Sequence, residues 1–202
     1  MATLLRPFAI YLVGMEALIN YLLQFGQLNV QQIELIKQKA KPESLTKNTY
    51  FSEAGKVPKR VAFIQEGILR VCYYNNKGEE ITRYFLEENH FAVDLSSFNQ
   101  QIPSAEYIQA VTDCRIVVFS ADALADLASI IVGWEAMLTK ITSRALLDKI
   151  SRISPMMAEN ASTRYRHFLE RFPQLAHRVP LSQLASYLGI TPSSLSRIRS
   201  SQ

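Results

Sequence analysis

Three patterns of apolar and polar positions follow one another along the chain, and each predicts a different kind of structure. Residues 8–40 place apolar side chains at helical intervals, in ALINYLLQF and again in NVQQIELIKQKA, where Asn29 can cap the helix. Residues 44–119 hold short runs rich in Val, Ile, Phe, Tyr and Thr between turn-forming Gly, Asn and Pro. From Ser120 onward the spacing is helical again. We therefore expect helices, then a β-rich region, then a second set of helices.

The β-rich region predicts an antiparallel barrel or jelly roll. NNKG at residues 75–78 lies between ILRVCYY and EITRYFL, which is a strong hairpin signal. EEN at residues 87–89 and QQIPS at residues 100–104 are further candidate turns, and YIQAVTDCRIVVFS closes the region as one or two strands. Several short strands at this spacing are typical of a closed antiparallel structure.

The longest expected helix is GWEAMLTKITSRALLDKISRIS, residues 133–154, after a shorter helix that Ser120 can cap. Pro155 should end it, because proline cannot continue the hydrogen-bond ladder. A helix of about twenty residues is roughly 30 Å long, and its apolar stripe must pack against its own barrel or against the same helix of a second chain. The stripe contains Trp134, Met137, Ile141 and Ala145. A further helix is expected over residues 159–172, stopped by Pro173.

Charge is unevenly distributed along the chain. The net charge is +4, but residues 1–140 carry 13 Lys/Arg and 15 Asp/Glu, whereas residues 141–202 carry nine Lys/Arg and three Asp/Glu. Eight of the nine C-terminal cations are arginine. An arginine-rich end on a neutral-to-acidic body indicates a polyanionic partner, although a solvated helical surface would give the same excess.

Several classes of protein are disfavoured. Cys72 and Cys114 are too few for a disulfide framework or a cysteine-only metal site, and both fall in strand-like runs, so buried free thiols are expected. His90, His167 and His177 are scattered, so no metal site, cofactor or catalytic residue is expected. FAIYLVGMEALINYLL at residues 8–23 is short and carries an acid, which favours a packed helix over a membrane span. We expect a cytoplasmic protein that is not an enzyme and has no membrane partner.

The stretch PLSQLASYLGITPSSLSRIRSSQ, residues 180–202, has the spacing of a helix-turn-helix. Ala185 is small enough for two helices to cross, and Gly189 four residues later can leave the first helix with a positive φ. Thr191 can cap the second helix with Pro192 in its first turn. Leu195 and Ile198 then point back to the first helix. The outward residues are serine and arginine with no acid, which favours DNA binding over a closing helical hairpin.

A β-rich domain, a long helix and a C-terminal helix-turn-helix, in this order, resemble the CRP/FNR family of bacterial transcription regulators. YIQAV, RYRHFLERFP and VPLSQLASYLGITPSSLSRIR are similar to a Bacteroidetes-type subgroup. The resemblance implies an α+β fold: an antiparallel β-roll (a double-stranded β-helix of the cyclic-nucleotide-binding kind), a long dimerisation helix and a winged-helix-type helix-turn-helix. It implies a cytoplasmic homodimer that binds palindromic double-stranded DNA and contacts RNA polymerase. Any wing is expected at residues 173–180.

Matching the terminal motif to the family carries roles over to single residues. The resemblance places Ser193 and Arg197 at base-reading positions, and Pro192 where the best-known member has an arginine, so that base contact should be missing. Phosphate-contacting positions, the last on charge alone, are Ser182, Thr191, Ser194 and Arg199.

Members of the family that bind a cyclic nucleotide carry a glycine, a glutamate and, about ten residues later, an arginine for the phosphate. In FAVDLSSFNQQIPSAEYIQAV the matching residues are Val93, Asp94 and Ser104, and Glu106 would repel a phosphate. We therefore expect no response to cyclic AMP. The domain then either binds another small-molecule effector or serves as a ligand-free scaffold. A pocket for such an effector would use Asp94, Ser96, Ser97 and Ser104.

We accordingly expect a sensor domain with N-terminal helices at residues 1–120, linking and dimerisation helices at 121–155 and a DNA-binding domain at 156–202. Two alternatives remain open. One is a small-molecule sensor or interaction module whose helix-turn-helix reads no DNA, and the other is a jelly-roll metalloenzyme, which would need clustered His and Glu ligands.

Overall fold

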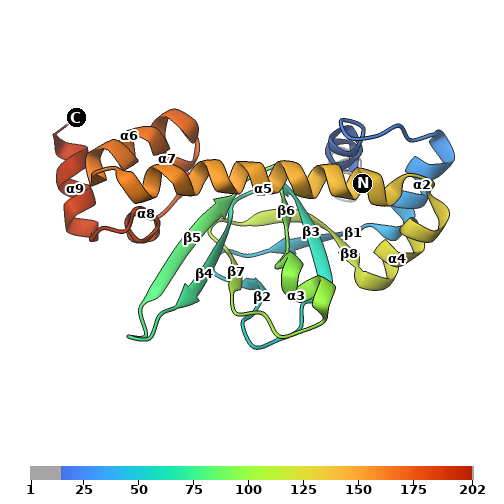
Figure 1. The fold of residues 1–202 in the computed structure, drawn as a ribbon, viewed down its shortest axis with the longest axis horizontal. Helices are drawn as coiled ribbons and strands as arrows, with labels where there is room; N and C mark the ends of the chain where they lie inside the picture. Colours follow the sequence, from blue (N-terminus) through green and yellow to red (C-terminus); the bar gives the residue numbers. More distant parts are fainter. Residues whose placement is uncertain (1–14, 202) are drawn as a thin grey trace, which may run out of the picture.

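The computed structural model describes residues 15–201, without the side chains of residues 152–158 (Figure 1). The part of the helix expected at residues 8–14 lies outside the described residues, and residues 15–22 are helical. The strands are β1 (Lys41–Leu45), β2 (Tyr50–Ser52), β3 (Arg60–Glu66), β4 (Leu69–Tyr74), β5 (Glu80–Leu86), β6 (Phe91–Ala92), β7 (Tyr107–Ala110) and β8 (Cys114–Ser120). The further helices are α2 (Val30–Lys39), α3 (Leu95–Gln100), α4 (Ala121–Ile130), α5 (Trp134–Ala158), α6 (Ala161–Arg171), α7 (Leu175–Arg178), α8 (Leu181–Leu188) and α9 (Pro192–Ser200).

Residues 41–120 form the β-roll. One four-stranded sheet has the order β1-β8-β3-β6, the other has the order β2-β7-β4-β5, and all pairs are antiparallel. The hairpin from β4 to β5 turns at NNKG, where Gly78 has a φ of 76° and donates its N–H to the Asn75 carbonyl. The expected jelly roll and its hairpin are confirmed.

The two central strands of the first sheet, β3 and β8, are buried on both faces, which explains their unbroken apolar runs. Along β3, Ala62 and Ile64 face the interior between the two sheets, and Phe63 between them packs in a second core with the helices. Along β8, Val117 and Phe119 join that second core. The helical partners come from residues 15–25, α2, α4 and the first half of α5, so the β-roll and these helices form one packed unit.

α5 crosses the molecule along its long axis and joins this unit to the last four helices (Figure 1). The predicted end of this helix at Pro155 is wrong, because α5 continues to Ala158. Pro155 cannot donate to the carbonyl of Ser151 one turn earlier. Arg171 of α6 lies there instead, with Nη1 at 3.4 Å from that carbonyl and Nη2 donating to the Ser151 hydroxyl at 2.7 Å. A side chain from another helix thus compensates the missing donor.

Residues 159–201 form the helical domain. Asn160 caps α6 by accepting the Thr163 N–H at 3.0 Å, and Pro173 follows the helix, as expected. The expected capping by Asn29 and Ser120 is also confirmed. The expected position of a wing is wrong, because residues 173–180 contain the short helix α7 (Leu175–Arg178), and the described part of this domain contains no strand.

Candidate nucleic-acid interface

The helix-turn-helix consists of α8 and α9, and its packing follows the predicted spacing. Leu184, Ala185 and Leu188 of α8 are buried against Leu195 of α9. Gly189 ends α8 with a φ of 67° and donates its N–H to the carbonyls of Ala185 and Ser186. A residue other than glycine would be strained at this φ. The sharp turn that sets the angle between the two helices therefore depends on Gly189.

The start of α9 is fixed by Thr191 and Pro192. The Thr191 hydroxyl accepts the Ser194 N–H at 3.2 Å and lies 3.0 Å from the Ser193 hydroxyl and 2.9 Å from the Ser194 hydroxyl. Pro192 occupies the first turn, where a missing N–H costs nothing. These hydroxyls therefore lie together at the exposed N-terminus of a helix, which is favourable for an anionic phosphate oxygen.

Ser193, Ser196 and Arg197 are exposed along one side of α9, and we call them the recognition surface. No hydrogen bond or ion pair joins the Arg197 guanidinium to any residue that the structure describes. α8 and α9 contain no acidic residue, and Ser182 is exposed at the start of α8. The recognition surface thus presents an unpaired cation beside hydroxyl groups, a combination that can bind phosphates and base edges.

Arg199 differs from Arg197. Its Nε donates to the Tyr165 hydroxyl at 3.0 Å, its Nη2 donates to the Ala176 carbonyl at 3.1 Å, and the guanidinium lies over the Tyr165 ring. Arg199 therefore connects α9 to α6 and α7. This geometry favours a structural role, and the phosphate contact expected from its charge stays a prediction.

The four residues of the expected effector pocket do not all come together. Asp94 caps α3 by accepting the Ser97 N–H at 3.2 Å, and its other oxygen accepts the Ser104 hydroxyl at 2.8 Å. Ser97 and Ser104 are buried. Ser96 is exposed and accepts a hydrogen bond from Gln100 instead. Burial raises the pKa of Asp94, but the hydrogen bonds from Ser104 and Ser97 outweigh it and hold the pKa below its usual range.

Charged groups near this cluster are also paired within the chain. Glu106, which was expected to repel a phosphate, forms an ion pair with Arg83 of β5, so the repulsion is largely neutralised. Lys149 of α5 lies over the Tyr84 ring with its Nζ 4.7 Å from the centroid. Burial and the nearby Arg83 lower the pKa of Lys149, which Asp94 partly offsets. Cations therefore do lie on this side of the β-roll, but they come from β5 and α5 rather than from the position of Ser104.

Three of the four residues of the stripe, which were expected on a dimerisation helix, pack within their own chain, and this is one of the two alternatives for the stripe. Trp134, Met137 and Ile141 are at most 5% exposed and belong to the core with residues 15–25 and α4, so they cannot also pack against a second chain. Ala145 is exposed. Apolar side chains with high exposure lie farther along α5, at Leu146 (57%), Leu147 (67%) and Ile150 (54%). We call these three residues the α5 apolar face. In the sequence, these apolar residues lie close together in an otherwise polar part of the helix, and this pattern is the signal that could have indicated the exposed apolar face.

Both thiols are buried and free, as expected. Burial raises the pKa of Cys72 to about 11 and also raises the pKa of Cys114. Over the described range no group of three or more His, Cys, Asp or Glu side chains could hold a metal ion. No helix in residues 15–201 is long and apolar enough to span a membrane.

Residues 42–130 match the family model of the cyclic nucleotide-binding domain. No curated protein sequence matches the chain.

Solved structures match over most of their length. FixK2 from Bradyrhizobium japonicum is 17% identical with a TM-score of 0.70, covering 80% of this chain and 83% of that one. The c-di-GMP responsive global regulator CLP from Xanthomonas campestris is 15% identical with a TM-score of 0.69, covering 86% and 91%. A putative CRP/FNR-family transcriptional regulator from Eubacterium rectale is 18% identical with a TM-score of 0.66, covering 85% and 82%.

These matches confirm the expected α+β fold, in which antiparallel sheets of the jelly-roll kind precede a set of C-terminal helices. The narrower Bacteroidetes-type subgroup stays a prediction. The chain therefore contains a cyclic nucleotide-binding domain at residues 42–130 and has the overall fold of the CRP/FNR transcription regulators.

Proposed function

We propose that this protein is a sequence-specific DNA-binding transcription regulator that acts as a homodimer on a palindromic operator. The observation that carries the proposal is the recognition surface: Arg197 is exposed and unpaired among the described residues, on a capped helix with no acidic neighbour. Arg197 and Ser193 would contact base edges in the major groove. Phosphates would be contacted by Ser182, Thr191 and Ser194, with Arg199 as a further expected contact.

The α5 apolar face would form the contact with a second copy of the chain. Leu147 and Ile150 are three residues apart, as two positions of a coiled-coil seam are, and Leu146 lies beside them on the half of α5 nearest the helical domain. A parallel pair of α5 helices would bury this face and place two recognition surfaces at one end of the dimer. Two-fold symmetric half-sites about one helical turn apart would then be bound together. RNA polymerase is a further partner proposed on the family resemblance.

Cyclic AMP is not the proposed effector. A nucleotide phosphate would have to displace Ser104 from Asp94 and would find a hydroxyl where a guanidinium is needed. The pocket side chains Asp94, Ser97 and Ser104 satisfy one another without a ligand. Another small molecule that binds the cations of β5 and α5 stays a proposal. Millimolar cyclic AMP should leave the melting temperature and the operator affinity unchanged.

A selection of bound fragments from random duplex DNA tests the function. We expect a palindromic motif, with binding that weakens steeply as salt rises. Running the selection with and without a cell extract would reveal an effector or a protein partner. If the bound fragments share no motif, the alternative is favoured, which is a sensor whose helix-turn-helix does not recognise DNA sequence.

A further inference from the structure

The helical domain is docked on the β-roll of its own chain through an apolar contact. Ile68, Phe85 and Val111 of the β-roll are buried in the same core as α6, α7, α8 and α9. The Phe85 and Tyr187 rings are 5.5 Å apart, and Tyr187 also packs against Phe168 of α6 at 5.6 Å. Side chains of the β-roll therefore complete the core of the helical domain.

A hydroxyl of α8 completes the edge of a sheet. β5 is the last strand of its sheet, so one side of its backbone has no partner strand. Ser186 accepts the Thr82 N–H at 2.9 Å and donates to the Glu80 carbonyl at 3.2 Å. This single side chain therefore satisfies a backbone donor and a backbone acceptor of the edge strand, which fixes the position of α8 along β5.

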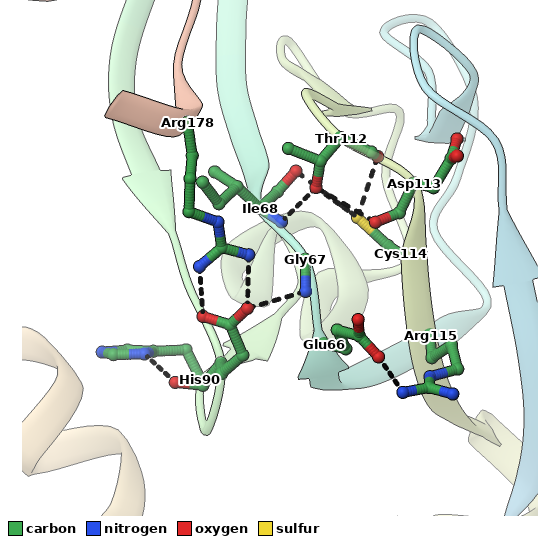
Figure 2. Close-up of polar contacts among 10 residues, drawn as sticks. Glu66, Gly67, Ile68, His90, Thr112, Asp113, Cys114, Arg115 and Arg178 are labelled. Carbon is green, nitrogen blue, oxygen red and sulfur yellow. Dashed lines mark hydrogen bonds and ion pairs between the residues drawn. The ribbon is translucent and has the colours of Figure 1, made fainter. Parts of the chain in front are cut away.

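An ion pair adds a third link, shown in Figure 2. Arg178, the last residue of α7, donates two hydrogen bonds to the Glu88 carboxylate, from Nη2 to Oε1 at 2.6 Å and from Nη1 to Oε2 at 3.1 Å. The same carboxylate accepts the Gly67 N–H at 2.8 Å. Burial raises the pKa of Glu88, but the bonds from Arg178 and Gly67 outweigh it and lower the pKa, while Glu88 raises the pKa of Arg178. Both groups therefore stay charged over the ordinary pH range.

The turn that carries this N–H donor is closely packed. Gly67 has a φ of 103°, and an added Cβ would lie 2.6 Å from the Asp113 carbonyl oxygen and from the Cys114 sulfur. The next residue, Ile68, donates its N–H to the Thr112 hydroxyl at 3.0 Å and accepts the Val111 N–H at 2.8 Å. The N–H of Gly67 is thus held in place, and with it the carboxylate that binds Arg178.

The docked arrangement leaves the recognition surface uncovered. Ser193 and Arg197 are exposed, and α9 lies at the far end of the long axis, away from the β-roll (Figure 1). Ser186 and Arg178 therefore fix the helical domain without covering the surface that would contact DNA. A domain held in the orientation in which it binds loses less freedom on binding than one that swings on its linker.

We infer that Glu88, Arg178 and Ser186 form an interdomain contact that holds the helical domain in its DNA-binding orientation, so that operator affinity depends on this contact. The inference rests on the proposed function for its DNA part. The docking itself is a property of the chain that can be measured without DNA.

The docking is tested first, by hydrogen exchange of the Thr82 amide in full-length protein without DNA. In Arg178→Glu, which does not touch Thr82, the exchange rate should rise about ten-fold, because loss of the ion pair lets Ser186 leave β5. Arg166→Glu makes the same change of charge on the exposed side of α6 and should leave the rate unchanged. An unchanged rate in Arg178→Glu, with the chain folded, overturns the interdomain contact.

The DNA part is tested by the affinity of Glu88→Lys for the selected operator. This substitution removes an acid and adds a cation, so nonspecific electrostatics alone would tighten binding to DNA. The interdomain contact predicts weaker binding, about ten-fold, and recovery of most of the loss in Glu88→Lys/Arg178→Glu, which has the wild-type net charge. Equal or tighter binding by Glu88→Lys overturns the inference.

The two failures are distinguishable. If wild-type protein selects no DNA sequence, the proposed function fails and the DNA part of the inference fails with it, while the exchange of the Thr82 amide still decides whether the domains are docked. If wild-type protein selects an operator and Glu88→Lys binds it undiminished, the function stands and the inference alone is wrong.

Discussion

The recognition surface of α9 and the polar cluster around Asp94 both combine charged groups with serine hydroxyls. They differ in whether the charged groups have partners within the chain. In the cluster, the carboxylate of Asp94 is satisfied by Ser97 and Ser104, and Glu106 is paired with Arg83. On α9, the Arg197 guanidinium has no hydrogen-bond or ion-pair partner among the side chains that the structure describes. Groups that are already paired stabilise the fold, whereas an exposed unpaired cation is available to a ligand. The comparison therefore favours α9 as the surface for the proposed DNA binding.

The largest effect is expected from breaking the proposed dimer, because a monomer carries only one recognition surface. Leu147→Asp/Ile150→Asp puts two carboxylates on the α5 apolar face, and burying them in a dimer costs about 3 kcal/mol or more. We expect monomers by sedimentation and loss of operator binding. Ala145→Asp is the matched control, because it lies on the other side of the same helix. A dimer that survives the double substitution would place the interface elsewhere.

The next effect separates the two arginines of α9. Arg197→Ala should weaken operator binding by roughly 1–3 kcal/mol and leave the melting temperature near that of wild type. Arg199→Ala should lower the melting temperature, since its bonds to Tyr165 and Ala176 are lost. Operator titrations and thermal melts of both variants check this. Equal effects of the two substitutions on binding and on stability would remove the distinction.

A smaller effect is expected from the polar cluster. Asp94→Asn should reduce the free energy of unfolding by about 1 kcal/mol at neutral pH, because Asp94 is only partly buried. The lowered pKa of Asp94 means that its stabilisation is present above the ordinary carboxyl pKa and is lost as the pH falls through the lowered value. Denaturant unfolding of both proteins should therefore converge in acid. If the difference in the free energy of unfolding between the two proteins stays constant down to low pH, the charge of Asp94 does not contribute to stability.

The smallest effect concerns Cys72. With a pKa of about 11, its thiol is almost entirely protonated at pH 8, so alkylation should be slow and should accelerate only in strong alkali. Mass spectrometry after brief iodoacetamide treatment measures this. Rapid labelling of folded protein near neutral pH would contradict the buried environment of this thiol.

The sequence predicted those features whose cause is local. Gly189, Thr191 and Pro192 are where a turn, a cap and a first helical position require such residues, and the NNKG hairpin has the same kind of cause. The six-residue helix α3 was missed because it is too short to show periodicity, although Asp94 is a good cap.

Features that depend on contacts between distant segments were not predictable in this way. The stripe of Trp134, Met137 and Ile141 indicated a buried face, but spacing cannot say whether the same chain or a second chain covers it. Pro155 was expected to end α5, and the compensation comes from Arg171, twenty residues after Ser151. Arg199 and Arg197 are two residues apart, and only the fold shows which of them is already bonded.

The central claim is that the recognition surface of α9 reads DNA sequence through Arg197. Parallel selections from random duplex DNA with wild-type protein and Arg197→Ala test it most directly. We expect a palindrome from wild type and, from the variant, the same half-site spacing with base preference lost at one position in each half-site. An identical motif from both proteins would contradict the claim.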